Sequence, residues 1–326
     1  MNKQSTTRPF GNTDLKISPI GLGTWQFSKR KNLAGKFWPA LSEEDSAQIV
    51  QISYENGINW FDTAELYGNG ESERTLARSL NKIPVGDEDV VIATKWSPLF
   101  RTANSIISTF SERQEALGAY SISLNQVHNP MSFSTIKKEM EAMAKLADQK
   151  KIKYIGVSNF SASQMRKAHE ELARHGYTLA SNQVQYNLIQ RKIERNEILK
   201  TAKELGTAII AYSPLAQGLL SGKFHVNPEN IKTKQGFTNG LPTFKRKNLD
   251  KTRPLINTLK QIAEKHDVTA AQVALNWLIN YHGDLVFAIP GASNTAQALS
   301  NAESMSFRLS DEEMNLIDQE SRMVQI

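Results

Sequence analysis

ISLNQVHNPMSFSTIKKEMEAMAKLADQKKIKYIGV, residues 122–157, contains the pattern that decides the fold. Its two ends, 122–127 and 152–157, are short apolar runs rich in β-branched residues, as expected for buried strands. Between them, apolar side chains recur at intervals of three and four and share one helical face: Phe133, Ile136, Met140, Met143 and Ala147. The stretch therefore predicts strand, helix and strand, the unit from which parallel sheets covered by helices are built.

The same alternation runs through most of the chain. Eight strands are predicted, at residues 20–24, 58–61, 90–94, 122–127, 152–157, 180–185, 208–212 and 285–289. Eight such units in 326 residues fit a closed (β/α)8 barrel of the TIM type. Because no linker or shift in composition divides the chain, we expect one domain over residues 1–326. A short β-hairpin is predicted before the barrel, where 8–11 and 15–17 flank a polar turn.

An open, doubly wound sheet is the alternative architecture. Sheets of that kind that bind dinucleotides carry a three-glycine fingerprint after the first strand. Here Gly21-Leu22-Gly23 is followed by Thr24-Trp25-Gln26, so the third glycine is missing and the barrel is preferred. Three helix starts are marked by capping boxes, beginning at Ser42, Ser161 and Thr269.

Composition narrows the class of protein. Lys and Arg number 39 against 33 Asp and Glu, a formal charge of +6, which fits either an anionic ligand such as a phosphorylated cofactor or a solvated surface. Because the charges are spread along the chain, no nucleic-acid partner is expected. The chain has no cysteine, which excludes disulfides and thiolate chemistry. Residues 1–9 lack the apolar stretch of a signal peptide, and no apolar run could span a membrane, so we expect a cytoplasmic protein.

Polar residues at the carboxyl ends of the predicted strands are the candidate catalytic groups, because active sites of parallel barrels form there. Asp62 ends the second strand, with Tyr67 beyond it, while Lys95 and His128 end the third and fourth. An ammonium favours phenolate and a carboxylate keeps the ammonium charged, so this set can move a proton at Tyr67. A neutral histidine can orient a substrate oxygen. Taken singly, each also fits a cap, a packed ring, a snorkelling lysine or a turn residue.

Blocks of sequence around these residues, in this order along the chain, resemble the aldo-keto reductase family over essentially its whole length. They include Gly57-Ile58-Asn59-Trp60-Phe61-Asp62-Thr63-Ala64, Ala93-Thr94-Lys95, Asn125-Gln126-Val127-His128-Asn129-Pro130, Ile155-Gly156-Val157-Ser158-Asn159-Phe160, Gln183-Val184-Gln185-Tyr186-Asn187, Ala211-Tyr212-Ser213-Pro214-Leu215 and Ile289-Pro290-Gly291-Ala292-Ser293. The match is most similar to bacterial-type reductases and to the β-subunits of voltage-gated potassium channels.

The resemblance implies roles for individual residues. Tyr67 is then the general acid–base, tuned by Lys95 with support from Asp62, and His128 positions the substrate. Ser158, Asn159 and Gln183 bind the nicotinamide carboxamide, and Tyr212 stacks on the ring. The full set of expected cofactor contacts is Thr24, Trp25, Asp62, Ser158, Asn159, Gln183, Tyr212, Ser213, Pro214, Leu215, Gln217, Gly218, Lys223, Gly291, Ser293, Gln297 and Asn301. The expected substrate pocket is Trp25, Tyr67, Trp96 and His128.

The cofactor implied is NADP. The family's better-known reductases carry basic residues where this chain has Gly291 and near Gln297, so the charge for a 2′-phosphate falls to Lys223 or to the cluster Lys245-Arg246-Lys247. Residues 213–250 lack clear periodicity and contain several glycines, so we expect a mobile lid that closes over the dinucleotide.

Three functions remain open at this stage. The first is a reductase acting on a small carbonyl or alcohol substrate, as a monomer or homo-oligomer. The second is a module that binds NADPH to regulate a partner, as channel β-subunits do. The third, a metal enzyme using His128 and Asp62, is least expected, because the other histidines lie on predicted helices or in the long loop and no dense ligand set appears.

Overall fold

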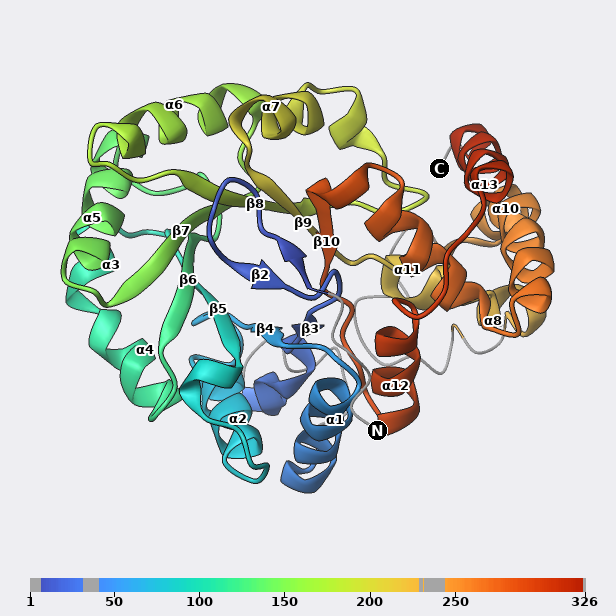
Figure 1. The fold of residues 1–326 in the computed structure, drawn as a ribbon, viewed down its shortest axis with the longest axis horizontal. Coiled ribbons are helices and arrows are strands. Elements are labelled where there is room, and N and C mark those ends of the chain that lie inside the picture. The colour runs from blue at the N-terminus through green and yellow to red at the C-terminus, as the bar shows by residue number, and fades with distance from the viewer. Residues whose placement is uncertain (1–6, 32–40, 229–230, 232–243, 325–326) are drawn as a thin grey trace.

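Eight parallel strands form the centre of the computed structural model, which describes residues 7–31, 41–228, 231 and 244–324. They are β3 Leu22–Gly23, β4 Trp60–Asp62, β5 Val91–Trp96, β6 Ile122–Val127, β7 Ile152–Ser158, β8 Leu179–Gln185, β9 Ala208–Tyr212 and β10 Val286–Ala288. Each strand pairs with the next along the chain. Parallel bridges from Ile20 to Ala288 and from Gly23 to Gly291 join the first strand to the last. The predicted (β/α)8 barrel is confirmed (Figure 1).

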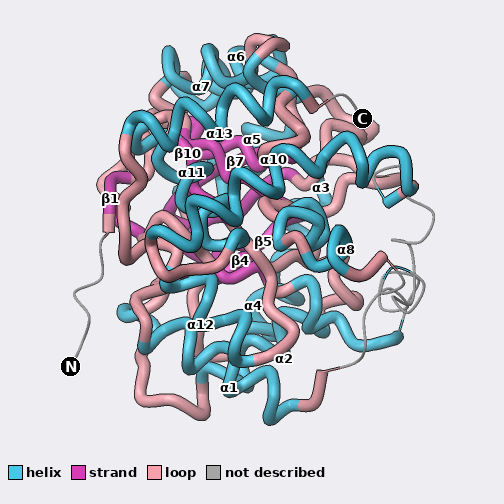
Figure 2. The backbone as a smooth tube through the Cα atoms, turned by 90° about the vertical axis from the view of Figure 1, so that its right-hand side faces the viewer, coloured by secondary structure: helices cyan, strands magenta, loops and turns pink. Residues whose placement is uncertain are grey.

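Helices form a layer around the strands (Figure 2). They are α1 Glu43–Glu55, α2 Glu71–Leu80, α3 Asn104–Ser108, α4 Phe110–Leu117, α5 Ile136–Asp148, α6 Ala162–Ala173, α7 Ile198–Leu205, α8 Lys223–Val226, α10 Arg246–Lys265, α11 Ala270–Asn280, α12 Thr295–Glu303 and α13 Asp311–Met323. Short 3₁₀ segments are η1 Trp25–Lys31, η3 Asp87–Asp89, η4 Lys192–Glu194, η5 Ala216–Ser221 and η8 Gly283–Leu285. The capping boxes predicted at Ser42, Ser161 and Thr269 are confirmed and start α1, α6 and α11.

Two local predictions were wrong. Phe133 is not part of the helical face, because the Thr135 side chain caps the helix and α5 begins at Ile136. Phe133 lies in the preceding loop, where its side chain is 71% exposed. The segment expected to be one aperiodic loop contains η5, α8 and the start of α10. The rest of the expected lid, 229–230 and 232–243, lies outside the described residues.

The N-terminal hairpin plugs one end of the barrel. Strands β1 Arg8–Pro9 and β2 Lys16–Ile17 pair antiparallel, as predicted, and lie across the middle of the barrel in Figure 1. Phe10 and Ile17 are fully buried in the core that fills the barrel, and the Phe10 ring lies 5.0 Å from that of Phe287. This is the end at which the strands begin, so a substrate must approach from the opposite end.

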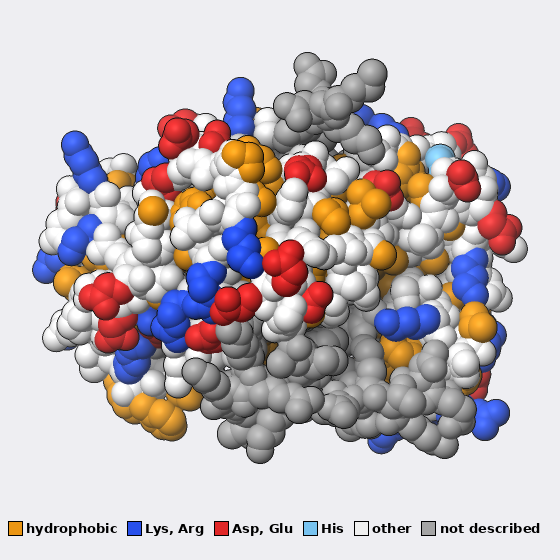
Figure 3. Space-filling model, turned by 90° about the horizontal axis from the view of Figure 1, so that it is seen from below, with side chains coloured by type: hydrophobic (Ala, Val, Ile, Leu, Met, Phe, Trp, Pro, Cys, Tyr) orange, Lys and Arg blue, Asp and Glu red, His pale blue; other side chains and the backbone are white. Residues whose placement is uncertain are grey.

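The outer surface mixes charges of both signs. On the face shown in Figure 3, Lys and Arg side chains lie interspersed with Asp and Glu. Within the described part of the chain, none of the helices is long and apolar enough to cross a membrane.

Candidate active site

Three neighbouring strands bring together the four residues predicted to carry the chemistry. Asp62 ends β4, Lys95 lies near the end of β5, and His128 directly follows β6. Tyr67 lies in the turn between β4 and α2. The Lys95 ammonium donates to Asp62 Oδ1 at 2.6 Å and to the Thr63 carbonyl at 2.8 Å. It lies 5.0 Å from the centroid of the Tyr67 ring, and the His128 ring meets Tyr67 edge-on at 5.8 Å.

The Lys95–Asp62 ion pair is shielded from solvent. Both side chains are fully buried, so the pair must be held by good geometry to offset the loss of water. Burial alone would lower the pKa of Lys95, but the charge of Asp62 and the hydrogen bonds to Asp62 and Tyr67 raise it overall. Lys95 is therefore a cation at neutral pH, beside the phenol.

The phenol of Tyr67 keeps its proton at neutral pH. Withdrawal from water raises its pKa, and the charge and hydrogen bond of Lys95 lower it by less, while Asp62 raises it further. The sequence led us to expect that the ammonium would lower this pKa. Lys95 does lower it, but burial outweighs Lys95 and the net shift is upward. The result is a protonated phenol with a cation poised to stabilise its phenolate, which suits a proton donor.

The His128 imidazole is neutral. Burial and, to a lesser extent, the charge of Lys95 lower its pKa to about 3. Its Nδ1 is buried and has no hydrogen-bond partner among the described side chains and backbone. A neutral ring beside a phenol can hydrogen-bond a carbonyl oxygen without adding a second cation to the site.

The residues predicted to bind nicotinamide line the same rim. Ser158 ends β7, Gln183 lies on β8 and Tyr212 ends β9. The Asn159 amide joins them, because its Oδ1 accepts from the Tyr212 hydroxyl at 3.1 Å and its Nδ2 donates to the His128 carbonyl at 3.3 Å. Gln183 donates from Nε2 to Asp62 Oδ2 at 2.8 Å, so its amide oxygen is the atom that could accept from a carboxamide.

The loop after β9 has an unusual backbone. Ser213, Ala216 and Gln217 have φ of 52°, 48° and 53°, in the left-handed region that non-glycine residues rarely adopt. The Asn187 amide holds the Ser213 carbonyl at 2.9 Å. Such strained positions cluster at ligand-binding sites. Pro214, Leu215 and Gly218 belong to this loop, and Lys223 follows it, exposed at the start of α8.

The residues after β10 hold one another. The Ser293 amide donates to Gln297 Oε1 at 2.9 Å, and the Asn301 amide donates to the Gly291 carbonyl at 3.3 Å. A side chain at Gly291 would collide with the amide of Gln26. The position where better-known reductases carry a basic residue is therefore closed by Gln26.

Two residues predicted to contact the ligands have buried side chains that form hydrogen bonds within the protein. Thr24 is fully buried, with its hydroxyl donating to the Asp62 carbonyl at 2.9 Å. Trp96 is buried too, and its indole donates to Ser105 at 3.0 Å. In this structure both side chains are therefore held by hydrogen bonds within the protein. Trp25 lies closer to the chemistry, with its ring 6.5 Å from that of Tyr67.

A residue that the sequence did not single out also reaches the centre. Gln126, two residues before His128, donates from Nε2 to Asp62 Oδ2 at 3.5 Å. The alternation of a strand was the available signal, because residues two apart face the same side. No group of three or more His, Asp or Glu able to hold a metal occurs among the described residues.

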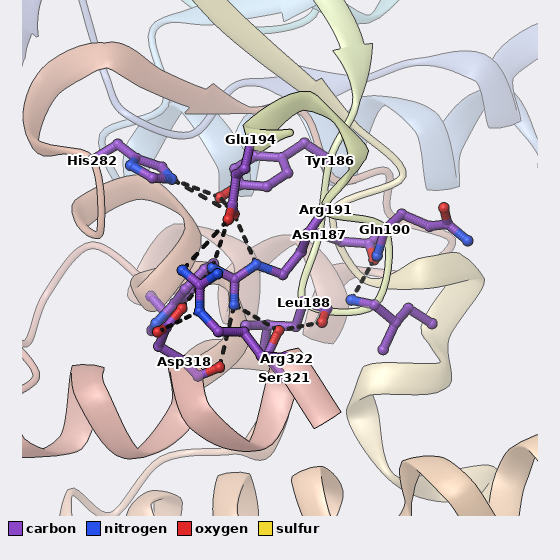
Figure 4. Close-up of polar contacts among 12 residues, drawn as sticks. Tyr186, Asn187, Leu188, Gln190, Arg191, Glu194, His282, Asp318, Ser321 and Arg322 are labelled. Atoms are coloured by element: carbon purple, nitrogen blue, oxygen red, sulfur yellow. Dashed lines mark hydrogen bonds and ion pairs between the residues drawn. The ribbon is translucent and has the colours of Figure 1, made fainter. Parts of the chain in front are cut away.

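A second polar network joins the loop after β8 to α13 (Figure 4). Arg191, in the loop after β8, donates to Glu194 at 2.8 Å and to Asp318 on α13 at 2.6 Å. The Tyr186 hydroxyl donates to Glu194 at 2.6 Å and meets His282 at 2.8 Å. We call Arg191, Glu194 and Asp318 the clamp, because they fasten the loop to the C-terminal helix.

Comparison with known proteins agrees with the geometry. The model of the Aldo/keto reductase family matches residues 19–322. An uncharacterized oxidoreductase of Mycobacterium tuberculosis is 36% identical over 310 residues, 94% of this chain and 90% of the relative. The chloroplastic pyridoxal reductase of Arabidopsis thaliana is 29% identical over 316 residues, 92% of this chain and 82% of the relative. The solved glycerol dehydrogenase of Gluconobacter oxydans has a TM-score of 0.82 at 27% identity, covering 97% of this chain and 95% of that one. The chain belongs to the aldo-keto reductase family, whose members reduce carbonyl groups with a nicotinamide cofactor.

Proposed function

We propose that this protein is an NADP-dependent reductase that passes a hydride between nicotinamide and an aldehyde or ketone, or the corresponding alcohol, with Tyr67 as general acid–base. The observation that carries the proposal is the chain of contacts from Asp62 through Lys95 to the Tyr67 ring. Metabolites with a small carbonyl or alcohol group are the substrate class, in line with the pyridoxal reductase and glycerol dehydrogenase among its relatives.

The residues of the chain fit a nicotinamide. The Gln183 amide oxygen and the Asn159–Tyr212 pair line the rim where a carboxamide and a flat ring would bind, and the His128 Nδ1 is a buried polar atom without a partner among the described groups. Bound nicotinamide supplies or accepts the hydride. Tyr67 gives its proton to the substrate oxygen, Lys95 stabilises the phenolate that remains, and His128 orients the carbonyl.

Loss of the Tyr67 hydroxyl tests this proposal. Tyr67→Phe should keep the fold and cofactor binding, yet lower kcat/KM for an aldehyde panel by about 10²–10⁴-fold, the usual contribution of a general acid–base. Steady-state turnover with NADPH is the measurement, and Tyr177→Phe is the control, because Tyr177 is partly buried and its hydroxyl donates to Asp148, away from the four residues at the rim. Near-normal turnover of Tyr67→Phe would refute the assignment. Wild type that binds NADPH but shows no carbonyl-dependent oxidation would favour the regulatory alternative.

Preference for NADP rests on cations near the cofactor loop. Lys223 starts α8, and Lys245, Arg246 and Lys247 are exposed at the start of α10, where the helix dipole also favours an anion. The two helices touch, because the Arg253 side chain of α10 donates to the His225 carbonyl of α8 at 3.4 Å. These groups compensate for the missing charge at Gly291.

The dependence of affinity on salt tests whether charge causes the preference for NADPH over NADH. NADPH should bind more tightly than NADH at low salt, and the gap should narrow as salt screens the contact. Fluorescence titration of both cofactors, with Lys223→Met beside a control Lys137→Met on α5, measures it. Equal affinities for the two cofactors at low salt would refute the NADP assignment.

A further inference from the structure

The Asp62 carboxylate is held from three sides inside the barrel. Lys95 occupies Oδ1, and two amides, those of Gln183 and Gln126, face Oδ2 at 2.8 Å and 3.5 Å. All four side chains are buried. A buried carboxylate needs such donors, because a lone pair that has lost its hydrogen bonds to water and found no other donor destabilises the fold.

The Gln126 amide is built into this position. Its oxygen accepts from the Ser181 hydroxyl at 3.2 Å, which turns the Nε2 group toward Asp62. On the same strand, Asn125 points the opposite way and contacts Met143 of α5. Asp62, Gln126 and Ser181 come from β4, β6 and β8, alternate strands of the barrel, which is how layers of side chains fill such a core.

The neighbouring strand leaves room for this layer. A Cβ atom at Gly156 on β7 would lie only 2.9 Å from Gln126 Cγ and would also collide with the Ser181 hydroxyl. A glycine in the interior of a strand costs stability, so its presence here fits a close approach of side chains. The space inside the barrel is thus shaped around the Gln126–Ser181 contact.

We propose that Gln126 is a positioning residue, which holds the Asp62 carboxylate and through it the Lys95 ammonium against Tyr67. The proposal rests on the proposed function of Tyr67 as acid–base. Gln183 has a second role, because its amide oxygen would accept from a bound carboxamide while its Nε2 donates to Asp62. Gln126 lies two residues below the rim and serves Asp62 alone. The titratable groups that meet Asp62 are Lys95 and Tyr67, with His128 beyond them.

The sign of the effect follows from the charges. Without the Gln126 N–H, the negative charge of Asp62 is less compensated, and that charge raises the pKa of Tyr67. Carbonyl reduction needs the protonated phenol, so the alkaline limb of its pH profile should move to higher pH. Alcohol oxidation needs the phenolate and should slow at neutral pH.

Gln126→Met tests the proposal, since methionine fills similar space without a polar group. We expect the midpoint of the alkaline limb of kcat/KM to move up by about 0.5–1 pH unit, because one hydrogen bond to the Asp62 carboxylate is lost and only part of its effect reaches Tyr67. The substitution should change kcat and leave KM for the cofactor unchanged. The ultraviolet titration of tyrosinate, taken as the difference from the matching Tyr67→Phe variant, reports the same shift without turnover.

Asn125→Leu is the control, because it removes a buried amide from the same strand on the opposite face. It should lower thermal stability and leave the pH profile in place. An unmoved profile in folded Gln126→Met, or an equal shift in Asn125→Leu, would overturn the proposal. If Gln126→Met does not fold, Ser181→Ala gives the same test with a smaller shift. Failure of the Tyr67 assignment would show separately, as near-normal turnover of Tyr67→Phe.

Discussion

Two buried ion-pair networks in this molecule differ in purpose. Lys95 and Asp62, inside the barrel mouth, are 0% and 1% exposed. The clamp of Arg191, Glu194 and Asp318, outside it, retains 8%, 11% and 15% exposure. The first network meets a phenol and a histidine at the proposed site of reaction, whereas the second joins a loop to a helix.

The difference teaches how to recognise a charge kept for chemistry. A buried pair gains little net stability over well-packed apolar side chains, so stability alone does not explain either network. In the clamp, the pairing itself holds α13 in place, and good packing could replace it. At the barrel mouth, the charge on Lys95 acts on Tyr67, and no apolar pair can supply that charge.

The largest expected effect is at Lys95. Lys95→Met should lower kcat/KM by about 10²–10⁴-fold and also destabilise the fold, because Asp62 is left buried and unpaired. The double variant Lys95→Met with Asp62→Leu should recover much of the thermal stability but none of the activity. Melting temperature and turnover of both variants are the measurements. If activity returned along with stability in the double variant, the charge on Lys95 would not be needed for the reaction.

The clamp should show the reverse balance. Arg191→Met should lower the free energy of unfolding by about 3–5 kcal/mol, because Glu194 and Asp318 lose a shared buried partner. Its kcat should stay near that of wild type, since Arg191 touches none of the four residues at the barrel mouth.

Arg322→Met is the matched control for this variant. Arg322 donates to the same Asp318 at 2.8 Å but is 57% exposed, so its loss should cost less than about 1 kcal/mol. Urea denaturation of both variants is the measurement. A large loss of kcat in Arg191→Met, with the fold intact, would merge the two networks into one functional unit.

A smaller effect separates the networks by pH. The Glu194 pKa is lowered to about 2 despite burial, by hydrogen bonds from His282, Arg191 and Tyr186. Its contribution is therefore present above the unfolded pKa of 4.5 and is lost as pH falls toward 2. The Lys95 pKa is raised, so the contribution of that group is present below 10.5 and lost as pH rises beyond it.

Melting temperatures across pH, relative to wild type, show the difference. The free energy of unfolding of Glu194→Gln should differ from that of wild type by about 1–3 kcal/mol near neutrality, and the two values should converge in acid. The stability of Lys95→Met should converge with that of wild type only in strong base. Two variants that converge at the same end of the pH scale would contradict the separation.

Sequence reasoning reached the barrel and the gathering of Asp62, Lys95 and His128 at one rim, because both follow from local patterns. Strand periodicity located β5 and β6, and the polar residue at the end of each strand marked Lys95 and His128. The burial of Thr24 and Trp96 was beyond reach, because it depends on Ser72 and Ser105, which come from other elements. Phe133 shows the same limit, since a capping threonine outweighed its apolar spacing.

The clamp left no local signal, and the Gln126 layer left only the alternation of its strand. Arg191 and Asp318 are 127 residues apart, and nothing in the sequence around one of them indicates the other. Gln126 stood within a matching block, but only the closed barrel shows that it shares a layer with Asp62 and Ser181. Contacts across the barrel are set by curvature and register, which a linear pattern does not contain.

The hairpin plug also has a consequence for how the chain is made. Arg8 donates to the Ile279 carbonyl at 2.7 Å, a partner 271 residues further along, and Phe10 packs on Phe287. At roughly 5–20 residues per second, a ribosome needs about 15–55 s to deliver that partner. Until then Phe10 and Ile17 lack the core surface that covers them in the folded chain. The hairpin is therefore among the last parts of this chain to settle, and chaperones that screen nascent chains have a long opportunity there.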